Sequence, residues 1–163
     1  MPQATYTPLA TITLGSAAST VTFSNIPTTG YRDLVLAFQV STTAAGVGIR
    51  FRPNSDAGNG SSVYMYGTGS GSGASGTASV MDIIYTDSTS VYSGTLQLFD
   101  HAQTDKHKTA LVRSGSGSSA GGNFVWAFAH RWASTTAVSS FQLVTSSSTM
   151  TAGSTFSLYG IAG

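Results

Sequence analysis

The chain of 163 residues contains no cysteine and no glutamate, and only 8% of its residues carry a charge. Without cysteine, disulfides and thiolate metal sites are excluded. Six acidic residues, all Asp, and seven Lys or Arg residues leave a formal net charge of +1. A nucleic-acid-binding protein is expected to carry a strongly basic patch. The charge balance therefore predicts that nucleic acid is not a partner.

Long apolar runs are scarce as well. No stretch approaches the roughly 18 apolar residues that a membrane-spanning helix needs. The N-terminal MPQATYTPLATITL lacks the basic segment and the apolar core of a signal peptide. We expect a protein that is made in the cytosol, carries no export signal and has no membrane partner.

Alternating apolar and polar residues dominate what is present, most clearly in the stretch 20–40, TVTFSNIPTTGYRDLVLAFQV. Two alternating runs flank a turn at Pro27 and Gly30, which is typical of strand, turn and strand. In the second run one face is fully apolar and the other is mixed: Leu34, Leu36, Phe38 and Val40 against Asp33, Val35, Ala37 and Gln39. Such a strand belongs in a sandwich, with its mixed face interpreted as turned toward a second layer or a neighbouring subunit.

Similar runs recur at residues 10–14, 47–52, 63–66, 80–85, 91–99, 109–113, 123–132, 138–145 and 155–161. There is no sustained helical periodicity, so about ten short strands predict an all-β fold. We expect one antiparallel β-sandwich domain over residues 1–163, jelly-roll-like, with long Gly/Ser loops. The low-complexity segments from Gly67 to Ser79 and from Gly115 to Asn123 are predicted to be such loops.

The segment from Asp100 to Lys108, DHAQTDKHK, is predicted to be an exposed hairpin tip. His101, Asp105 and His107 are of the types that bind transition metals. Their spacing across a turn fits no defined ligand interval, and the same residues suit a solvated polar tip. A solvated tip is the favoured interpretation, with ion binding left open.

Three further motifs favour structural interpretations. Asn54, Asp56 and Asn59 resemble a calcium loop, but the closing Glu is missing, and a capped turn fits better. The Gly-rich segments lack the lysine and the helix of a phosphate-binding loop. Local glycine-framed serines lack the strand-to-helix context of a nucleophile elbow. The sequence therefore predicts no catalytic, cofactor-binding or metal-binding residue, and the chain is predicted not to be an enzyme.

Several aromatic and basic side chains leave alternatives open. The aromatic residues of the predicted strands suit core packing better than sugar stacking: Tyr64, Tyr66, Tyr85, Tyr92, Trp126 and Trp132. Arg50 and Arg52 share one strand face, which faces either solvent or an Asp of a neighbouring subunit. His130 shares a face with aromatic residues and is interpreted as a hydrogen-bonded histidine at a sheet edge.

Three segments together resemble a family of proteins. ATITLGSAASTVTFSNIPTTGYRDLVLAFQV, VGIRFRPNSDAGNGSSVY and the C-terminal TAGSTFSLYGIAG occur in this order. They resemble a small β-sandwich domain of virion proteins of tailed bacteriophages. The turn at 52–56 carries an additional proline, Pro53, relative to that pattern.

The resemblance implies a homotrimer in the virion, assembled in the host cytoplasm. Because the domain fills the chain, we expect a capsid decoration (cement) protein that binds the major capsid protein or other virion proteins. The alternative is a tail-fibre or head-fibre module that recognises a host surface glycan. The low charge agrees with a protein that is packed against neighbours.

Overall fold

The computed structural model describes residues 5–86, 90–116 and 124–163. These residues form twelve strands: β1 (Tyr6–Thr13), β2 (Thr20–Phe23), β3 (Asp33–Val40), β4 (Val47–Pro53), β5 (Gly60–Gly67), β6 (Ser72–Ala78), β7 (Asp82–Thr86), β8 (Tyr92–Phe99), β9 (Lys108–Ser116), β10 (Val125–Trp132), β11 (Phe141–Thr145) and β12 (Thr155–Ile161). The predicted all-β antiparallel sandwich is confirmed, with twelve strands in place of about ten.

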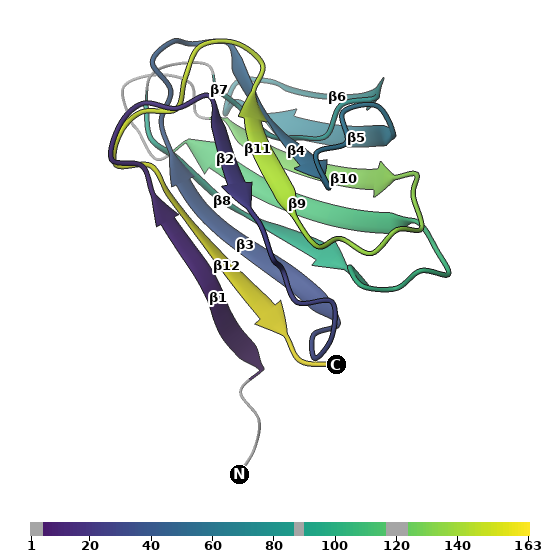
Figure 1. The fold of residues 1–163 in the computed structure, drawn as a ribbon. Coiled ribbons are helices and arrows are strands. Elements are labelled where there is room, and N and C mark those ends of the chain that lie inside the picture. The colour runs from purple at the N-terminus through teal and green to yellow at the C-terminus, as the bar shows by residue number, and fades with distance from the viewer. Residues whose placement is uncertain (1–4, 87–89, 117–123) are drawn as a thin grey trace.

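The strands form two antiparallel sheets that pack face to face (Figure 1). The large sheet has the order β1-β12-β3-β8-β9-β10-β5-β6, and the small one has the order β2-β11-β4-β7. The alternation read from the sequence decides which face of each strand is inside. On β3 the run from Leu34 to Val40 buries every second side chain, and the facing strand β11 buries Phe141 and Leu143. Burial of these side chains stabilises the sandwich.

The mixed face of β3 does not turn toward the second sheet, so that interpretation is wrong. Val35 and Ala37 are half-buried and Gln39 is exposed, on the face of the large sheet that points away from the small one. We call this face the outer face. Asp33 is the exception on it, because it is buried at 2% exposure.

The predicted loop from Gly67 to Ser79 is also wrong, because it contains β6. Thr68 N donates to Gly71 O at 2.8 Å, and Gly69 takes a φ of 82° between them. A glycine with positive φ at the first central position makes a two-residue hairpin turn that matches the twist of paired strands. β6 then pairs with β5 along its whole length. The second predicted Gly/Ser loop, at 115–123, lies mostly outside the described residues, as does the turn at 87–89.

The described chain contains no apolar helix of membrane-spanning length.

Candidate assembly surface

The outer face of the large sheet divides into two halves of different chemistry. Register aligns its residues in rows across the strands, one row running from Ala37 through Thr95, Arg113 and Ala127 to Met65. We call the outer face of β1, β12, β3 and β8 the hydroxyl half. We call the outer face of β9, β10, β5 and β6 the apolar half.

The apolar half exposes large side chains to solvent. Val63, Met65, Leu111 and Val125 have 62%, 64%, 51% and 66% of their surface exposed. Their strands are neighbours in the sheet, so the four side chains form one patch. The largest apolar patch on a soluble monomer covers about 300–600 Å² and is often functional.

A shallow groove runs over this patch along β10. Ala127 and Ala129 form its floor, because they lie in register between the larger side chains of β9 and β5. The groove has a volume of about 600 Å³ and ends at Ala74 of β6. Arg113 is the charged side chain that lines it. A flat apolar surface with a small-residue channel and a single cation fits another protein surface better than it fits a polar small molecule.

The hydroxyl half is the more polar of the two, although Tyr6 on its edge strand β1 is 57% exposed. Thr11 and Ser157 share a hydrogen bond of 3.1 Å across β1 and β12, and Thr13 and Thr155 share one of 3.2 Å. Ser93 and Thr95 continue the polar rows onto β8. Cross-strand hydroxyl pairs of this kind stabilise a sheet while they remain hydrated. The difference between the halves therefore lies in their outer residues, since both bury apolar side chains beneath.

Four of the six aromatic residues considered for sugar stacking lie on the inner side of the apolar half, whereas Tyr92 lies on β8 and Tyr85 on β7 of the small sheet. Tyr64 and Tyr66 are half-buried against Trp126, with ring centroids 5.7 and 4.8 Å from it. Tyr92 and Trp132 are buried in the core at 0% and 4% exposure. Tyr85 alone of the six is well exposed, at 44%, with its ring 6.4 Å from that of Trp126. The structure places these rings mainly against one another.

His130 lies in the same layer and is not at a sheet edge as predicted, because β10 is flanked by β9 and β5. Its Nδ1 is 2.7 Å from Ser62 Oγ, whose own hydrogen is donated to Val80 O at 2.5 Å. Since the hydroxyl has one hydrogen, Nδ1 must be the donor in the first bond. Burial lowers the pKa of His130 to about 4. The buried Ser62 hydroxyl is thus not directed at a basic ring nitrogen, as a catalytic serine would be.

Arg50 was predicted to face solvent or an Asp of a neighbouring subunit; its side chain is 35% exposed, and the Asp that it contacts belongs to the same chain. Its Nε lies 3.7 Å from Asp82 Oδ1 of the same chain. Burial raises the pKa of Asp82 to about 6, and the Arg50 charge opposes that rise. Arg52, two residues on, is half-buried. The Arg50–Asp82 pair joins β4 to β7, at the point where their register shifts.

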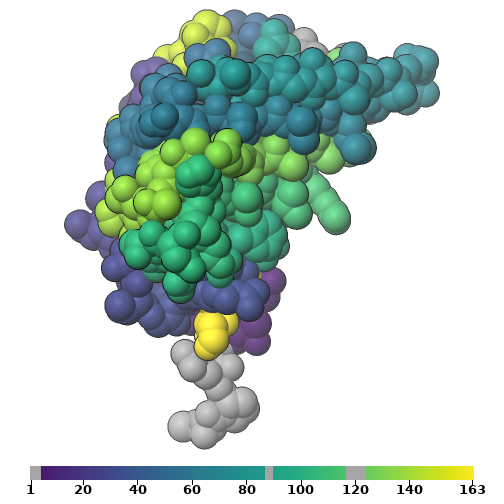
Figure 2. Space-filling model, turned by 90° about the vertical axis from the view of Figure 1, so that its right-hand side faces the viewer, coloured from purple at the N-terminus to yellow at the C-terminus, as the bar shows by residue number. Residues whose placement is uncertain are grey.

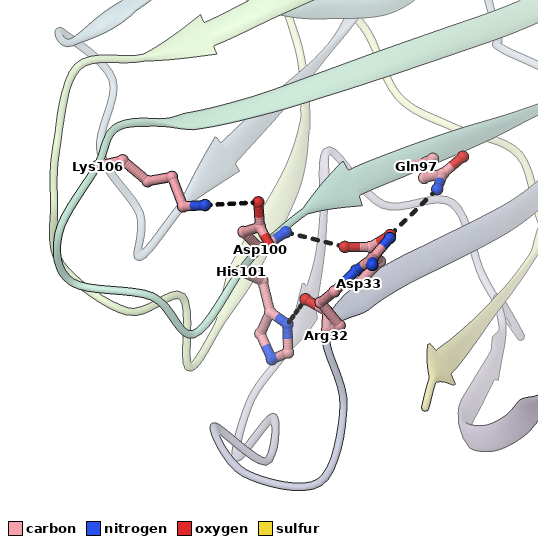
Figure 3. A network of polar contacts seen from close by, with 6 residues as sticks. All are labelled: Arg32, Asp33, Gln97, Asp100, His101 and Lys106. Carbon is pink, nitrogen blue, oxygen red and sulfur yellow. Dashed lines mark hydrogen bonds and ion pairs between the residues drawn. The ribbon is translucent and has the colours of Figure 1, made fainter. Parts of the chain in front are cut away.

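The segment 100–108 is exposed only in part, which corrects the predicted tip (Figure 3). His101 is completely buried, with Nε2 at 2.9 Å from Pro27 O and Nδ1 at 3.2 Å from Arg32 O. His107 Nδ1 instead accepts from Arg131 Nη2 at 2.7 Å. The imidazoles of His101 and His107 are thus hydrogen-bonded to different parts of the chain. The described residues contain no group of three His, Asp or Glu side chains arranged to hold a metal.

Lys108 is also buried, at 0% exposure. Its Nζ donates to Lys106 O at 3.0 Å and Thr135 O at 3.2 Å, and burial lowers its pKa. Nearby, Lys106 Nζ contacts Asp100 Oδ2 at 2.9 Å. Asp100 N in turn donates to the buried Asp33 Oδ1 at 3.0 Å. The segment therefore anchors the β8–β9 connection to the start of β3 (Figure 3).

The calcium-like segment is a capped turn, as the sequence favoured. Asp56 accepts from Asn59 Nδ2 at 2.7 Å, Gly58 N at 2.8 Å and Trp132 Nε1 at 2.8 Å. Together these donors lower the pKa of Asp56 to about 2. Asn54 binds backbone groups of the segment before β11, including Ala137 O at 2.9 Å. The polar side chains are thus occupied by the turn and its neighbours.

Comparisons with known proteins give little beyond the fold. No family model matches the chain, and no curated protein matches it. Two solved structures of alginate lyase Aly36B, one of them a mutant in complex with an alginate tetrasaccharide, are similar with TM-scores of 0.30 and 0.31. Each is 10% identical and covers 93% of this chain and 80% of the other. This finding contradicts the prediction that the chain is not an enzyme, and that prediction is withdrawn. TM-scores this low carry no argument for lyase activity in this chain.

Sequence reasoning missed the apolar half as a surface. Its four exposed residues stand singly in β5, β9 and β10, separated by up to 62 positions. The available signal was that Val63, Met65, Leu111 and Val125 occupy the face opposite the aromatic or aliphatic core residues of their strands. Only the strand order brings the four together.

Proposed function

We propose that this chain is a bacteriophage virion structural protein, a capsid decoration (cement) protein that binds the major capsid lattice as a homotrimer. The observation that carries the proposal is the apolar half of the outer face. A lone soluble domain gains no stability from Val63, Met65 and Val125, because each exposes more than half of its surface. Contact with another protein surface removes that area from water.

We assign the apolar half to the contact between copies in the trimer. Permanent interfaces between copies are more apolar than transient ones and resemble a divided core. Apart from Arg113, which lines the groove, the centre of the patch carries small and apolar residues, and its other cation, Arg131, is exposed. Charges depleted at the centre of a patch are the compositional signature of an interface core. The virion and the capsid lattice as partner rest on the resemblance of the sequence segments.

The test is the copy number of the protein per virion. A decoration protein is expected in hundreds of copies on an icosahedral head, and its gene is expected next to that of the major capsid protein. A handful of copies at the tail, with the gene among those for tail fibres, would overturn the proposal.

The second candidate function is recognition of a host surface glycan by a tail or head fibre. The observation in its favour is Tyr85, which is 44% exposed and lies beside Trp126. An exposed ring at the margin of an aromatic cluster can stack on a sugar. Quenching or enhancement of Trp fluorescence by host glycans, lost in Tyr85→Ala, would support this candidate. No change with intact host surface polysaccharide would exclude it.

A further inference from the structure

The two sheets have four edge strands, and three of them carry features that hinder pairing with another chain. β1 contains Pro8 and a register shift beside it. β2 is only four residues long. β7 begins with a charged residue, Asp82, at a register shift in its partner β4. Proline, bulges, short strands and inward charges are the usual means by which proteins protect sheet edges.

β6 is the fourth edge and has none of these features. Its seven residues, SGASGTA, include no charge and no proline, and its register with β5 is unbroken. Six of the seven are exposed. In Figure 2 the β5–β6 part, blue to teal, projects beyond the body of the molecule, so the edge is open to approach.

The hydrogen-bond pattern shows which backbone groups face this open edge. Ser79 N donates to Gly60 O at 2.6 Å, and Thr68 N donates to Gly71 O at 2.8 Å, at the two ends of the β5–β6 pair. In an antiparallel ladder every second pair of residues exchanges hydrogen bonds. Gly73, Ser75 and Thr77 therefore bond toward β5. The residues between them direct their N–H and C=O groups outward: Ser72, Ala74, Gly76 and Ala78.

We propose that this edge pairs antiparallel with β6 of a second copy of the chain, about a twofold axis at Ser75. In that register Ser72 pairs with Ala78 of the second copy, and Ala74 pairs with Gly76. All four outward-directed residues then lie in hydrogen-bonded pairs, which gives about eight hydrogen bonds at two per pair. The outer face of one copy continues into the outer face of the other.

A second copy of the chain is the partner that best fits the free edge of β6. A twofold contact requires a surface that is complementary to itself. β6 meets this requirement, because it carries no charge that would face its own copy and its largest side chain is Thr77. The contact lies in the plane of the sheet and leaves the apolar half uncovered. It is therefore separate from the proposed trimer contact and does not depend on it.

The absence of native cysteine permits a direct test by disulfide trapping. Ser75 lies on the proposed axis in a non-hydrogen-bonded pair, where the Cα atoms are about 4.5 Å apart and within disulfide range. Thr77 is the matched control, since two copies of it would be four positions out of register and about 13 Å apart. We expect Ser75→Cys to form disulfide-linked dimers at least tenfold faster than Thr77→Cys under the same mild oxidant.

Ala74→Pro provides the second variant. It removes a backbone N–H that points to the free edge, so the β5–β6 ladder is retained. Introduced into Ser75→Cys, it is expected to slow dimer formation to the rate of Thr77→Cys. Equal rates for Ser75→Cys and Thr77→Cys, or no slowing by Ala74→Pro, would overturn the proposal. Such a result would leave the copy number per virion, and so the proposed function, untouched.

Discussion

The hydroxyl half and the apolar half belong to one continuous sheet, yet exposed large aliphatic side chains gather on only one of them. Beneath both, the inner face is apolar: Leu36 and Leu96 lie under the first, and Val112 and Phe128 under the second. On the outside, Thr95 occupies the same row as Met65. The inner faces of both halves thus supply the hydrophobic core. We attribute the apolar outer side chains to assembly.

The largest effect is expected where a residue serves the fold. Leu96 on β8 is 1% exposed on the inner face, whereas Leu111 on the next strand, β9, is 51% exposed on the outer face. Leu96→Ala is expected to lower the free energy of unfolding by about 2–5 kcal/mol, because it leaves a cavity. In the Met65→Asp background, where the trimer contact is disfavoured, Leu111→Ala is expected to change it by less than about 0.5 kcal/mol. Urea unfolding of both variants checks this. Similar losses in the two would show that Leu111 is covered within the chain.

The hydroxyl half contains one buried charge, and its loss is expected to have the next largest effect. Asp33 accepts from Asp100 N at 3.0 Å and from Arg32 Nη2 and Gln97 Nε2 at 3.4 Å (Figure 3). Asp33→Ala leaves the Asp100 N–H without its acceptor, at a cost of about 1–3 kcal/mol. The matched control is Thr95→Ala, an exposed position of the same half. If the midpoint of thermal unfolding is unchanged in both Asp33→Ala and Thr95→Ala, the Asp33 network is not required for stability.

Two titrating groups, one in each sheet, have opposite effects on stability. The pKa of His130 is lowered from 6.5 to about 4 by burial, so its contribution is lost as the pH falls from 6.5 to 4. The pKa of Asp82 is raised from 3.8 to about 6, chiefly by burial. Its contribution is therefore present below pH 3.8 and lost as the pH rises through 6.

Between pH 4 and 6 the two slopes oppose each other. His130→Gln is therefore expected to gain stability relative to the wild type as the pH falls from 6.5 to 4. Asp82→Asn is expected to gain stability relative to the wild type as the pH rises from 3.8 to 6. Midpoints of urea unfolding between pH 3.5 and 7.5 measure both effects. Parallel pH profiles for the wild type and both variants would contradict the assignment.

The sequence predicted those parts of the fold that depend on local alternation. β3 and β10 show it strongly, and their inner faces are as predicted. β6 was missed because Gly, Ser and Ala have low strand propensity, and its pairing with β5 is what makes it a strand. The burial of Asp33 depends on Asp100, 67 positions away. No local sequence pattern indicates a hydrogen-bond partner that is so distant along the chain.

The apolar half could not be predicted from the sequence, for a related reason. Alternation shows that Leu111 and Val125 lie opposite the core residues of their strands, but it does not show that the strands are adjacent. The crossover that places β10 between β9 and β5 creates the patch. Strand order depends on contacts over the whole chain, and the sequence pattern alone left it open.

The central claim is that the apolar half forms the contact between copies in a trimer. Multi-angle light scattering at micromolar concentration tests it with Met65→Asp and the matched control Thr95→Asp, which share a row across the sheet. The account predicts trimers, three times 16.7 kDa, or trimers joined through their β6 edges, for the wild type and for Thr95→Asp. It predicts no species larger than a β6-paired dimer for Met65→Asp, because a buried carboxylate without a partner disfavours the trimer contact. A wild type without trimers, or a Met65→Asp variant that assembles like the wild type, would contradict it.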